Sequence, residues 1–191
     1  MTVAHRIDPR HLGRLDSPLR KLLLPPAPLL ARLGLREGDV LLDVGAGSGH
    51  FSFPAAELVG EKGRVHAIDI EPKAIELLSE KRDRRGAANV DIHLSSDSAL
   101  GVPEATGSFA LLFTVLHEAE DKKGLLLLIR RALSRGGRIA IVEFRKAFVP
   151  GPPPSERISE DEMRGLLEAS GFSGIRSEKL NFALYASFAT A

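Results

Sequence analysis

The sequence contains no cysteine. Disulfide bonds, zinc sites with thiolate ligands and a cysteine nucleophile are therefore excluded. The sequence also has no hydrophobic run of the length that spans a bilayer. Residues 1–16 carry arginines and histidines without an apolar core, which differs from a secretory signal peptide. We expect a cytoplasmic protein without a membrane span.

An excess of charge of either sign is also missing, since 26 lysines and arginines face 25 aspartates and glutamates. Nucleic-acid-binding proteins usually carry a basic stripe, because contacts to phosphates supply most of their affinity. Basic residues cluster at 81–85 and at 130–135, near the C-terminal ends of two expected helices. Cations at such ends interact favourably with the helix dipole. We interpret both clusters as solvated helix ends and expect no nucleic-acid partner.

The 191 residues, 43% of them hydrophobic, are suited to one domain with a substantial core. Apolar segments typical of strands alternate with segments typical of helices, which predicts an α/β fold with a mostly parallel sheet. The expected strands are the stretch from Val40 into Asp43, then 64–68, 90–94, 109–115, 138–143, 175–180 and 182–188. The expected helices are 19–24, 27–33, 51–59, one that starts at Pro72, one containing 125–129, and one from the capping box of Ser159 and Glu162 to about Gly171. We expect Gly136 and Gly137 to form a turn, 148–154 a proline-rich loop, and 1–26 an arm before a domain of residues 27–191.

The segment from Val40 to Gly49 reads Val-Leu-Leu-Asp-Val-Gly-Ala-Gly-Ser-Gly. A buried strand that ends in a glycine turn and opens a helix is how open α/β sheets build a nucleotide site at their carboxyl edge. Glycine allows the tight turn and a close approach of the backbone to a ligand. Dinucleotide-binding folds use the spacing G-x-G-x-x-G, with the pyrophosphate at the helix N-terminus. The spacing here is G-x-G-x-G, preceded by an acid, which disfavours a pyrophosphate cradle.

This motif closely resembles the first motif of the class I S-adenosylmethionine-dependent methyltransferases. Asp69 follows the second expected strand, 20 residues after Gly49, and Ser-Ser-Asp-Ser at 95–98 follows the third. Residues 133–144 resemble the L-x-P-G-G-x-hydrophobic-E-F signature of small-molecule methyltransferases of the quinone-biosynthesis type. The resemblance covers roughly residues 35–190. It implies a Rossmann-like, open, mostly parallel sheet of seven strands, with helices on both faces and an antiparallel last strand.

The resemblance also implies S-adenosylmethionine as the cofactor. Its predicted binding residues are Asp43, Gly45, Ala46, Gly47, Gly49, Asp69, Ile70, Asp97, Ser98 and Thr114. Asp69 would hold the ribose hydroxyls, Ile70 would form a wall against the adenine, and Asp97 would lie near the adenine amine. Asp43 would lie near the methionyl part. Each acid has a structural alternative, because aspartate is also common in ordinary turns and at strand ends.

No catalytic residue is assigned from the sequence, and no metal is expected. His117 and Glu118 follow the strand expected nearest the methyl donor, but a lone histidine in a loop is more often structural. A dedicated base is unnecessary if the acceptor loses its proton easily or after the transfer. Tyr185, the one tyrosine, is expected to pack in the core.

The sequence therefore predicts a methyltransferase with a small-molecule acceptor. The fourth strand lacks the Asn/Asp-Pro-Pro-aromatic sequence of enzymes that methylate nucleic-acid amines, and the absence of cysteine excludes a cysteine adduct with pyrimidine C5 or thiols that hold a metalloid. One departure from the family is Ala110, where an aspartate is usual. Two alternatives stay open: a non-catalytic S-adenosylmethionine-binding protein and a nicotinamide-dependent oxidoreductase. The resemblance further suggests that residues 1–24 cover the site as a mobile arm.

Overall fold

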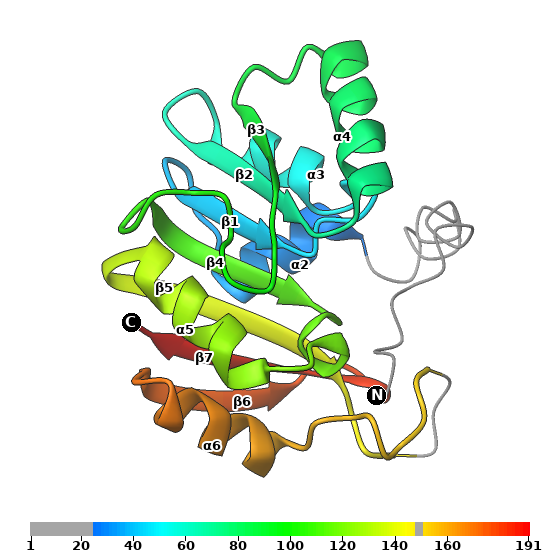
Figure 1. Ribbon diagram of the computed structural model, residues 1–191, viewed down its shortest axis with the longest axis vertical. Helices are drawn as coiled ribbons and strands as arrows, with labels where there is room; N and C mark the ends of the chain where they lie inside the picture. The colour runs from blue at the N-terminus through cyan, green and yellow to red at the C-terminus, as the bar shows by residue number, and fades with distance from the viewer. Residues whose placement is uncertain (1–24, 148–150) are drawn as a thin grey trace.

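The computed structural model of the protein describes residues 25–147 and 151–191 (Figure 1). The predicted helix 19–24 and the predicted covering arm lie outside these residues. Seven strands form one sheet in the order β3-β2-β1-β4-β5-β7-β6. The strands are β1 (Val40–Val44), β2 (Arg64–Asp69), β3 (Val90–Leu94), β4 (Gly107–Phe113), β5 (Leu133–Phe144), β6 (Ser173–Lys179) and β7 (Leu184–Thr190).

The first five strands pair in parallel, whereas β7 lies between β5 and β6 and is antiparallel to both. The predicted seven-stranded, mostly parallel sheet with an antiparallel last strand is confirmed. The burial pattern explains the parallel core: every residue of β1 after Val40 is buried, and so is every residue of β2 after Arg64. Strands buried on both faces are typical of parallel sheets covered by helices.

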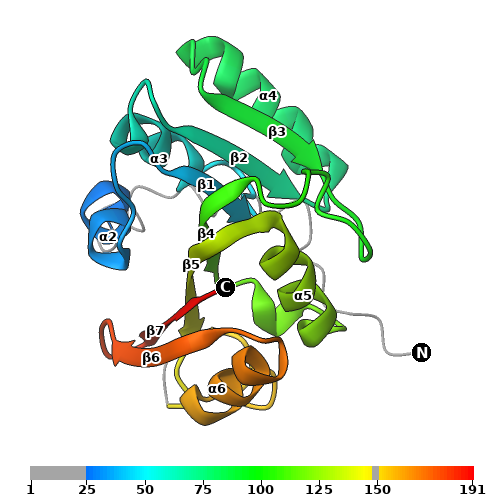
Figure 2. The ribbon, with the colours of Figure 1, turned by 90° about the vertical axis from the view of Figure 1, so that its left-hand side faces the viewer.

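Helices cover both faces of the sheet (Figure 2). The helices α2 (Pro26–Leu33), α3 (Ser52–Val59) and α4 (Pro72–Arg85) cover one face, and α5 (Lys122–Ala132) and α6 (Glu160–Ala169) cover the other, with a short 3-10 turn η2 (Leu116–Glu118) after β4. Each face has its own hydrophobic core, one containing Phe53 and Leu78 and the other containing Leu126 and Met163. No described helix is long and apolar enough to cross a membrane.

Several element ends differ from the prediction. The two glycines at 136–137 lie inside β5, which begins at Leu133 because Leu133 pairs with Gly107 before the register shifts. The last two strands begin at Ser173 and Leu184, each two residues from its predicted start. The predicted capping box at α6 is confirmed, with both reciprocal hydrogen bonds between Ser159 and Glu162.

The carboxyl ends of the parallel strands meet at one edge of the sheet, where backbone hydrogen bonds join the loops. The amides of Gly45 and Ala46 donate to the carbonyl of Ile68 at 2.8 and 3.0 Å. The amide of Ser95 donates to the carbonyl of Asp69, and that of Thr114 to the carbonyl of Val142, both at 2.8 Å. The loops that follow β1, β2, β3 and β4 are therefore held together at this edge.

Candidate functional site

A cavity of about 390 Å³ lies at this edge. Its size is within the range of small-molecule sites. It is lined by residues that follow four strands: Asp43–Ser48, His50, Phe51, Asp69–Glu71, Ser95–Asp97, Leu100, Phe113–Val115, Glu118–Asp121 and Leu125. Eight of the ten predicted binding residues are among them, and Gly49 and Ser98 are not. The structure thus brings together residues that are up to about 80 positions apart in the sequence.

Two glycines of the loop, Gly45 and Gly49, are required for different physical reasons. At Gly45, φ is +76°, and an added Cβ would lie 2.4 Å from Cγ2 of Val115, so the absence of a side chain lets the end of β4 approach the loop. At Gly49, φ is +81°, and an added Cβ would lie 2.4 Å from a ring carbon of Phe53. Gly49 therefore serves the packing of α3 beneath the loop and does not face the cavity.

Asp69 connects the glycine loop to the start of α4. Its two carboxylate oxygens accept hydrogen bonds from the amide of Gly47 at 2.7 Å and from the amide of Glu71 at 2.9 Å. Burial raises the pKa of this carboxyl, against the lowering effect of these amides. A carboxylate has about four lone-pair positions, so Asp69 retains acceptor capacity toward the cavity that it lines.

Asp43 lies at the end of β1 and is 3% exposed. It accepts a hydrogen bond of 2.5 Å from the hydroxyl of Ser52, the first residue of α3. Burial raises the pKa of Asp43 to about 6. The side chain thus orders the strand-to-helix connection and also lines the cavity.

The other predicted residues lie around the same opening. Ile70 is one of the exposed large hydrophobic residues, at 40%, and it lines the cavity, as does Asp97. Ser98 lies in a tight turn closed by a bridge between Ser96 and Ala99, with its hydroxyl 3.3 Å from that of Ser96. Thr114 has a φ of +56°. A β-branched residue in this region is strained, and such strain is concentrated at functional sites.

Several lining residues were not predicted from the sequence, among them His50, Phe51, Leu100 and Leu125. His50 and Phe51 directly continue the glycine motif, which was a usable signal. Leu100 follows the 95–98 motif by two residues, whereas Leu125 lies far from any motif and is placed here only by the folded chain. Tyr185 is fully buried and donates a hydrogen bond of 2.8 Å to the carbonyl of Ile158, as expected for a packing residue.

The cavity is strongly acidic. Seven of its lining residues carry carboxyl groups: Asp43, Asp69, Glu71, Asp97, Glu118, Glu120 and Asp121. No lysine or arginine is found among the described residues that line it. Burial raises the pKa of Glu118 to about 7. The site therefore favours a positively charged ligand over an anionic one.

His117 lies beside this cavity, in the η2 turn. Its Nδ1 is 2.8 Å from Oε2 of Glu143, and its backbone amide donates to Oε1 of Glu143 at 3.2 Å. Its Nε2 is 3.8 Å from Oε1 of Glu118. Burial by itself lowers the pKa of His117, but the hydrogen bond to Glu143 and the charge of Glu143 outweigh this effect, so the pKa is raised.

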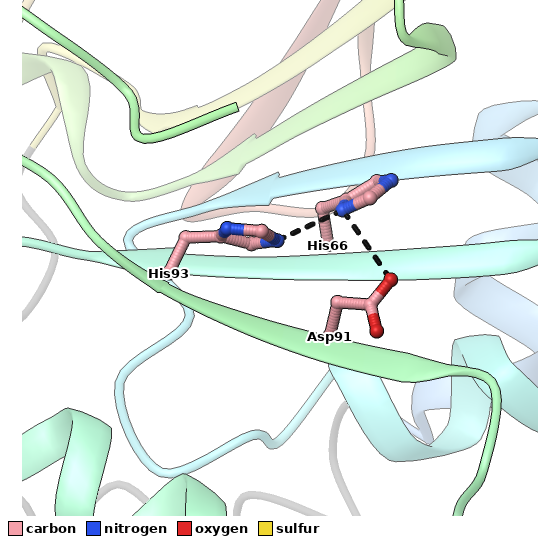
Figure 3. A group of neighbouring side chains, drawn as sticks. All are labelled: His66, Asp91 and His93. Atoms are coloured by element: carbon pink, nitrogen blue, oxygen red, sulfur yellow. Dashed lines mark hydrogen bonds and ion pairs between the residues drawn. The ribbon is translucent and has the colours of Figure 1, made fainter. Parts of the chain in front are cut away.

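A second polar group lies on β2 and β3 (Figure 3). The side chains of His66, Asp91 and His93 point toward one another, and one ligand atom from each lies within 4.8 Å of the others. These are atoms that could hold a metal ion. The two imidazoles are joined by a 2.9 Å hydrogen bond, and Asp91 forms an ion pair of 2.8 Å with Arg64. These three side chains therefore already have polar partners within the protein. The absence of a metal stays a prediction.

Comparison with known proteins matches this geometry to one family. The family model described as a methyltransferase domain matches residues 35–172. The chain is 36% identical over 124 residues to the aklanonic acid methyltransferase DauC of Streptomyces sp. (strain C5), which covers 61% of this chain and 54% of that protein. It is 29% identical over 122 residues to the ubiquinone/menaquinone biosynthesis C-methyltransferase UbiE of Francisella tularensis subsp. novicida (strain U112), which covers 63% of this chain and 49% of that protein.

The aligned part of this chain thus spans about half the length of these curated relatives. Among solved structures, a SAM dependent methyltransferase from Aquifex aeolicus is similar over nearly the whole of both chains. Its TM-score is 0.91 at 30% identity, and the match covers 97% of this chain and 99% of that one. The protein therefore belongs to the methyltransferase-domain family.

Proposed function

We propose that the protein binds S-adenosylmethionine in the 390 Å³ cavity and transfers its methyl group to a small-molecule acceptor. The observation that carries this proposal is the charge of the cavity, which has seven carboxyl groups and neither lysine nor arginine among its described lining residues. S-adenosylmethionine has a sulfonium and an ammonium group against one carboxylate, so it is a net cation. A nicotinamide dinucleotide would place two phosphate charges against the same carboxylates, and like charges in contact cost several kcal/mol.

The lining residues fit the parts of this ligand. The free acceptor capacity of Asp69 is suited to the ribose hydroxyls, and Ile70 presents apolar surface for the adenine, with Asp97 at the adenine amine. The loop from Gly45 to Ser48 and the buried Asp43 would lie along the methionyl part. When bound, the sulfonium supplies an electrophilic methyl group, and the protein's own contribution is binding, alignment and exclusion of water.

A small-molecule acceptor is supported by two observations. The curated relatives are named for aklanonic acid and for ubiquinone/menaquinone biosynthesis. The basic clusters that end α4 and α5 are partly engaged within the protein, because Arg82 pairs with Asp83, and Arg131 pairs with Glu104. We therefore also propose that nucleic acid is not the acceptor and that the protein acts in the cytoplasm.

Calorimetric titration with S-adenosylmethionine, S-adenosylhomocysteine and NAD tests the binding proposal. We expect heat for the first two ligands and none for NAD, whereas the reverse result would support the oxidoreductase alternative. Transfer is tested with methyl-labelled S-adenosylmethionine and metabolite extracts. Tight binding of S-adenosylmethionine without any labelled product would support the alternative of a non-catalytic binding protein.

A further inference from the structure

We infer that the imidazole of His117 is the general base of the transfer, and that it removes the proton of a weakly acidic hydroxyl, phenolic or enolic, on the acceptor. The inference rests on the proposed function, because it names the acceptor chemistry for that site. The observation that carries it is that His117 lines a second cavity next to the acidic one, with one ring nitrogen held by a buried carboxylate.

The second cavity has a volume of about 700 Å³ and lies along the groove between α5 and α6. Its lining residues include His117, Lys122, Lys146, Ile158 and Leu166. His117 lines this second cavity, and the next residue, Glu118, lines the acidic cavity. The imidazole thus borders the second cavity and lies one residue from the lining of the acidic cavity, so we assign the acceptor to the second cavity and the methyl donor to the acidic one.

Glu143 decides which nitrogen of His117 is basic. Its carboxylate is fully buried and contacts both the amide and Nδ1 of His117. A carboxylate can only accept hydrogen bonds, so the neutral imidazole carries its proton on Nδ1 and keeps the lone pair on Nε2. Glu143 is thus a positioning residue, and it stabilises the imidazolium that forms when Nε2 takes a proton.

The surroundings of His117 favour that imidazolium. Glu143 approaches it from β5, Glu118 from the same turn, and Glu156 from the segment before α6, while Lys122 lines the second cavity at the start of α5. Lys146 and Arg157 also line that cavity, but Lys146 is paired with Glu162 at 2.7 Å, and the charges that shift the pKa of His117 are those of the three carboxylates. A phenolic hydroxyl has a pKa of about 10. A histidine whose imidazolium is stabilised by neighbouring carboxylates can therefore remove its proton. The apolar surface of Ile158 and Leu166 is suited to the ring of such an acceptor.

The step balances without any further reactant. The hydroxyl proton moves to Nε2 of His117, and an electron pair of the resulting oxyanion, or of the ring carbon conjugated with it, forms the new bond to the methyl carbon. The carbon–sulfur bond breaks, and its electron pair stays on sulfur, which becomes neutral. His117 then releases its proton to water.

A chromophoric phenol tests the proton transfer without methyl transfer. 4-Nitrophenol is titrated into the protein saturated with S-adenosylhomocysteine, and the absorption of the bound phenol is followed as a function of pH. In the wild-type protein we expect ionisation at a pH lower by roughly one to three units than in His117→Gln, the size typical of an opposite charge within a few ångströms. In Glu143→Gln we expect the ionisation pH of the bound phenol to lie between those of the wild type and His117→Gln. In Glu143→Asp, which keeps a carboxylate, we expect a value closer to that of the wild type.

His93→Gln is the matched control, because it removes a histidine from the β2–β3 group and should leave the ionisation of the bound phenol unchanged. The inference is overturned if 4-nitrophenol does not bind the wild-type complex, or if it ionises at the same pH in the wild type and in His117→Gln. Calorimetry with S-adenosylhomocysteine on the same samples separates the two proposals. If the wild-type protein does not bind S-adenosylhomocysteine, the proposed function is contradicted. If it does bind, but the bound phenol ionises at the same pH in the wild type and in His117→Gln, only the role of His117 is contradicted.

Discussion

Asp69 accepts a 2.7 Å hydrogen bond from the backbone amide of Gly47, which lies 22 residues earlier in the chain. The same carboxylate accepts a bond from the amide of Glu71. The Asp69 side chain, at the end of β2, therefore fixes the glycine loop after β1. The same residue is the predicted acceptor for the ribose hydroxyls, so the shape of the cavity and the binding of the ribose both depend on it.

Asp69→Ala is expected to weaken binding of S-adenosylhomocysteine by about 10- to 150-fold, because a hydrogen bond to a charged group contributes roughly 1.5–3 kcal/mol. Calorimetry measures the affinity, and circular dichroism checks that the variant is folded. Asp83→Ala, at the exposed end of α4, is the control and should bind like the wild type. A folded Asp69→Ala protein with wild-type affinity would remove Asp69 from the site.

Gly49→Ala should destabilise the protein by about 2–4 kcal/mol. The new Cβ would overlap the ring of Phe53 and lie 2.9 Å from Leu78, and an overpacked core typically costs about 1–3 kcal/mol. The left-handed backbone adds roughly 1 kcal/mol. Gly165→Ala is the matched control: it lies inside α6 with open space around it, and it should stabilise by about 0.5–1 kcal/mol. Urea unfolding of both variants decides, and equal effects would contradict this account of Gly49.

Affinity for S-adenosylmethionine should rise with pH through about 7, because Glu118 becomes charged there and attracts the sulfonium. Deprotonation of the neighbouring His117 acts in the same direction. We expect a change of up to roughly tenfold, or ~1.4 kcal/mol, and a smaller one for S-adenosylhomocysteine, whose sulfur is neutral. Calorimetry at pH 6 and 8 (roughly one unit either side of this pKa) checks this. Glu118→Gln should flatten the profile, and an identical profile for both ligands would exclude a role of Glu118 near the sulfur.

The His66–His93 pair should reduce stability in acid. Burial, followed by the charge of His93, lowers the pKa of His66 from 6.5, while Asp91 opposes this and Arg64 adds to it. The unfolded chain then binds more protons than the folded one, so this contribution to the free energy of unfolding falls as the pH decreases below 6.5. Urea unfolding as a function of pH should show a steeper acid loss for the wild type than for His66→Gln. Parallel curves for the two proteins would contradict the prediction.

The sequence predicted the regular part of the fold because the strands there are buried on both faces. At the C-terminal end the predicted strand boundaries differ from those of the structure. Phe182 suggested the start of a strand, but it is 70% exposed and lies before β7. The glycines at 136–137 suggested a turn; they lie within β5, but at the irregularity where its register against β4 shifts between Leu133 and Arg138, and Gly136 has a φ of +75°. The pairing of Leu133 with Gly107 before this irregularity is a tertiary contact that local propensity does not encode.

The candidate site divides in the same way. Asp43, Gly45 and Asp69 could be recognised because each lies in a local motif or directly at a strand end. The hydrogen bond between His117 and Glu143 could not be recognised from the sequence, because the two residues are 26 positions apart. Their contact depends on the adjacent positions of β4 and β5 in the sheet, which no local pattern encodes.

The position of β7 has a consequence for the order in which the protein folds. Among the described strands, β6 pairs only with β7, and β7 follows it in the chain. While the chain is being synthesised, β1 to β5 can pair as they emerge, but β6 has no place in the sheet until β7 lies against β5. Helix α6 packs on α5 and also on β6 and β7, so its packing is complete only when these two strands have joined the sheet. The groove between α5 and α6 is therefore completed last, after the glycine-loop half of the sheet has formed.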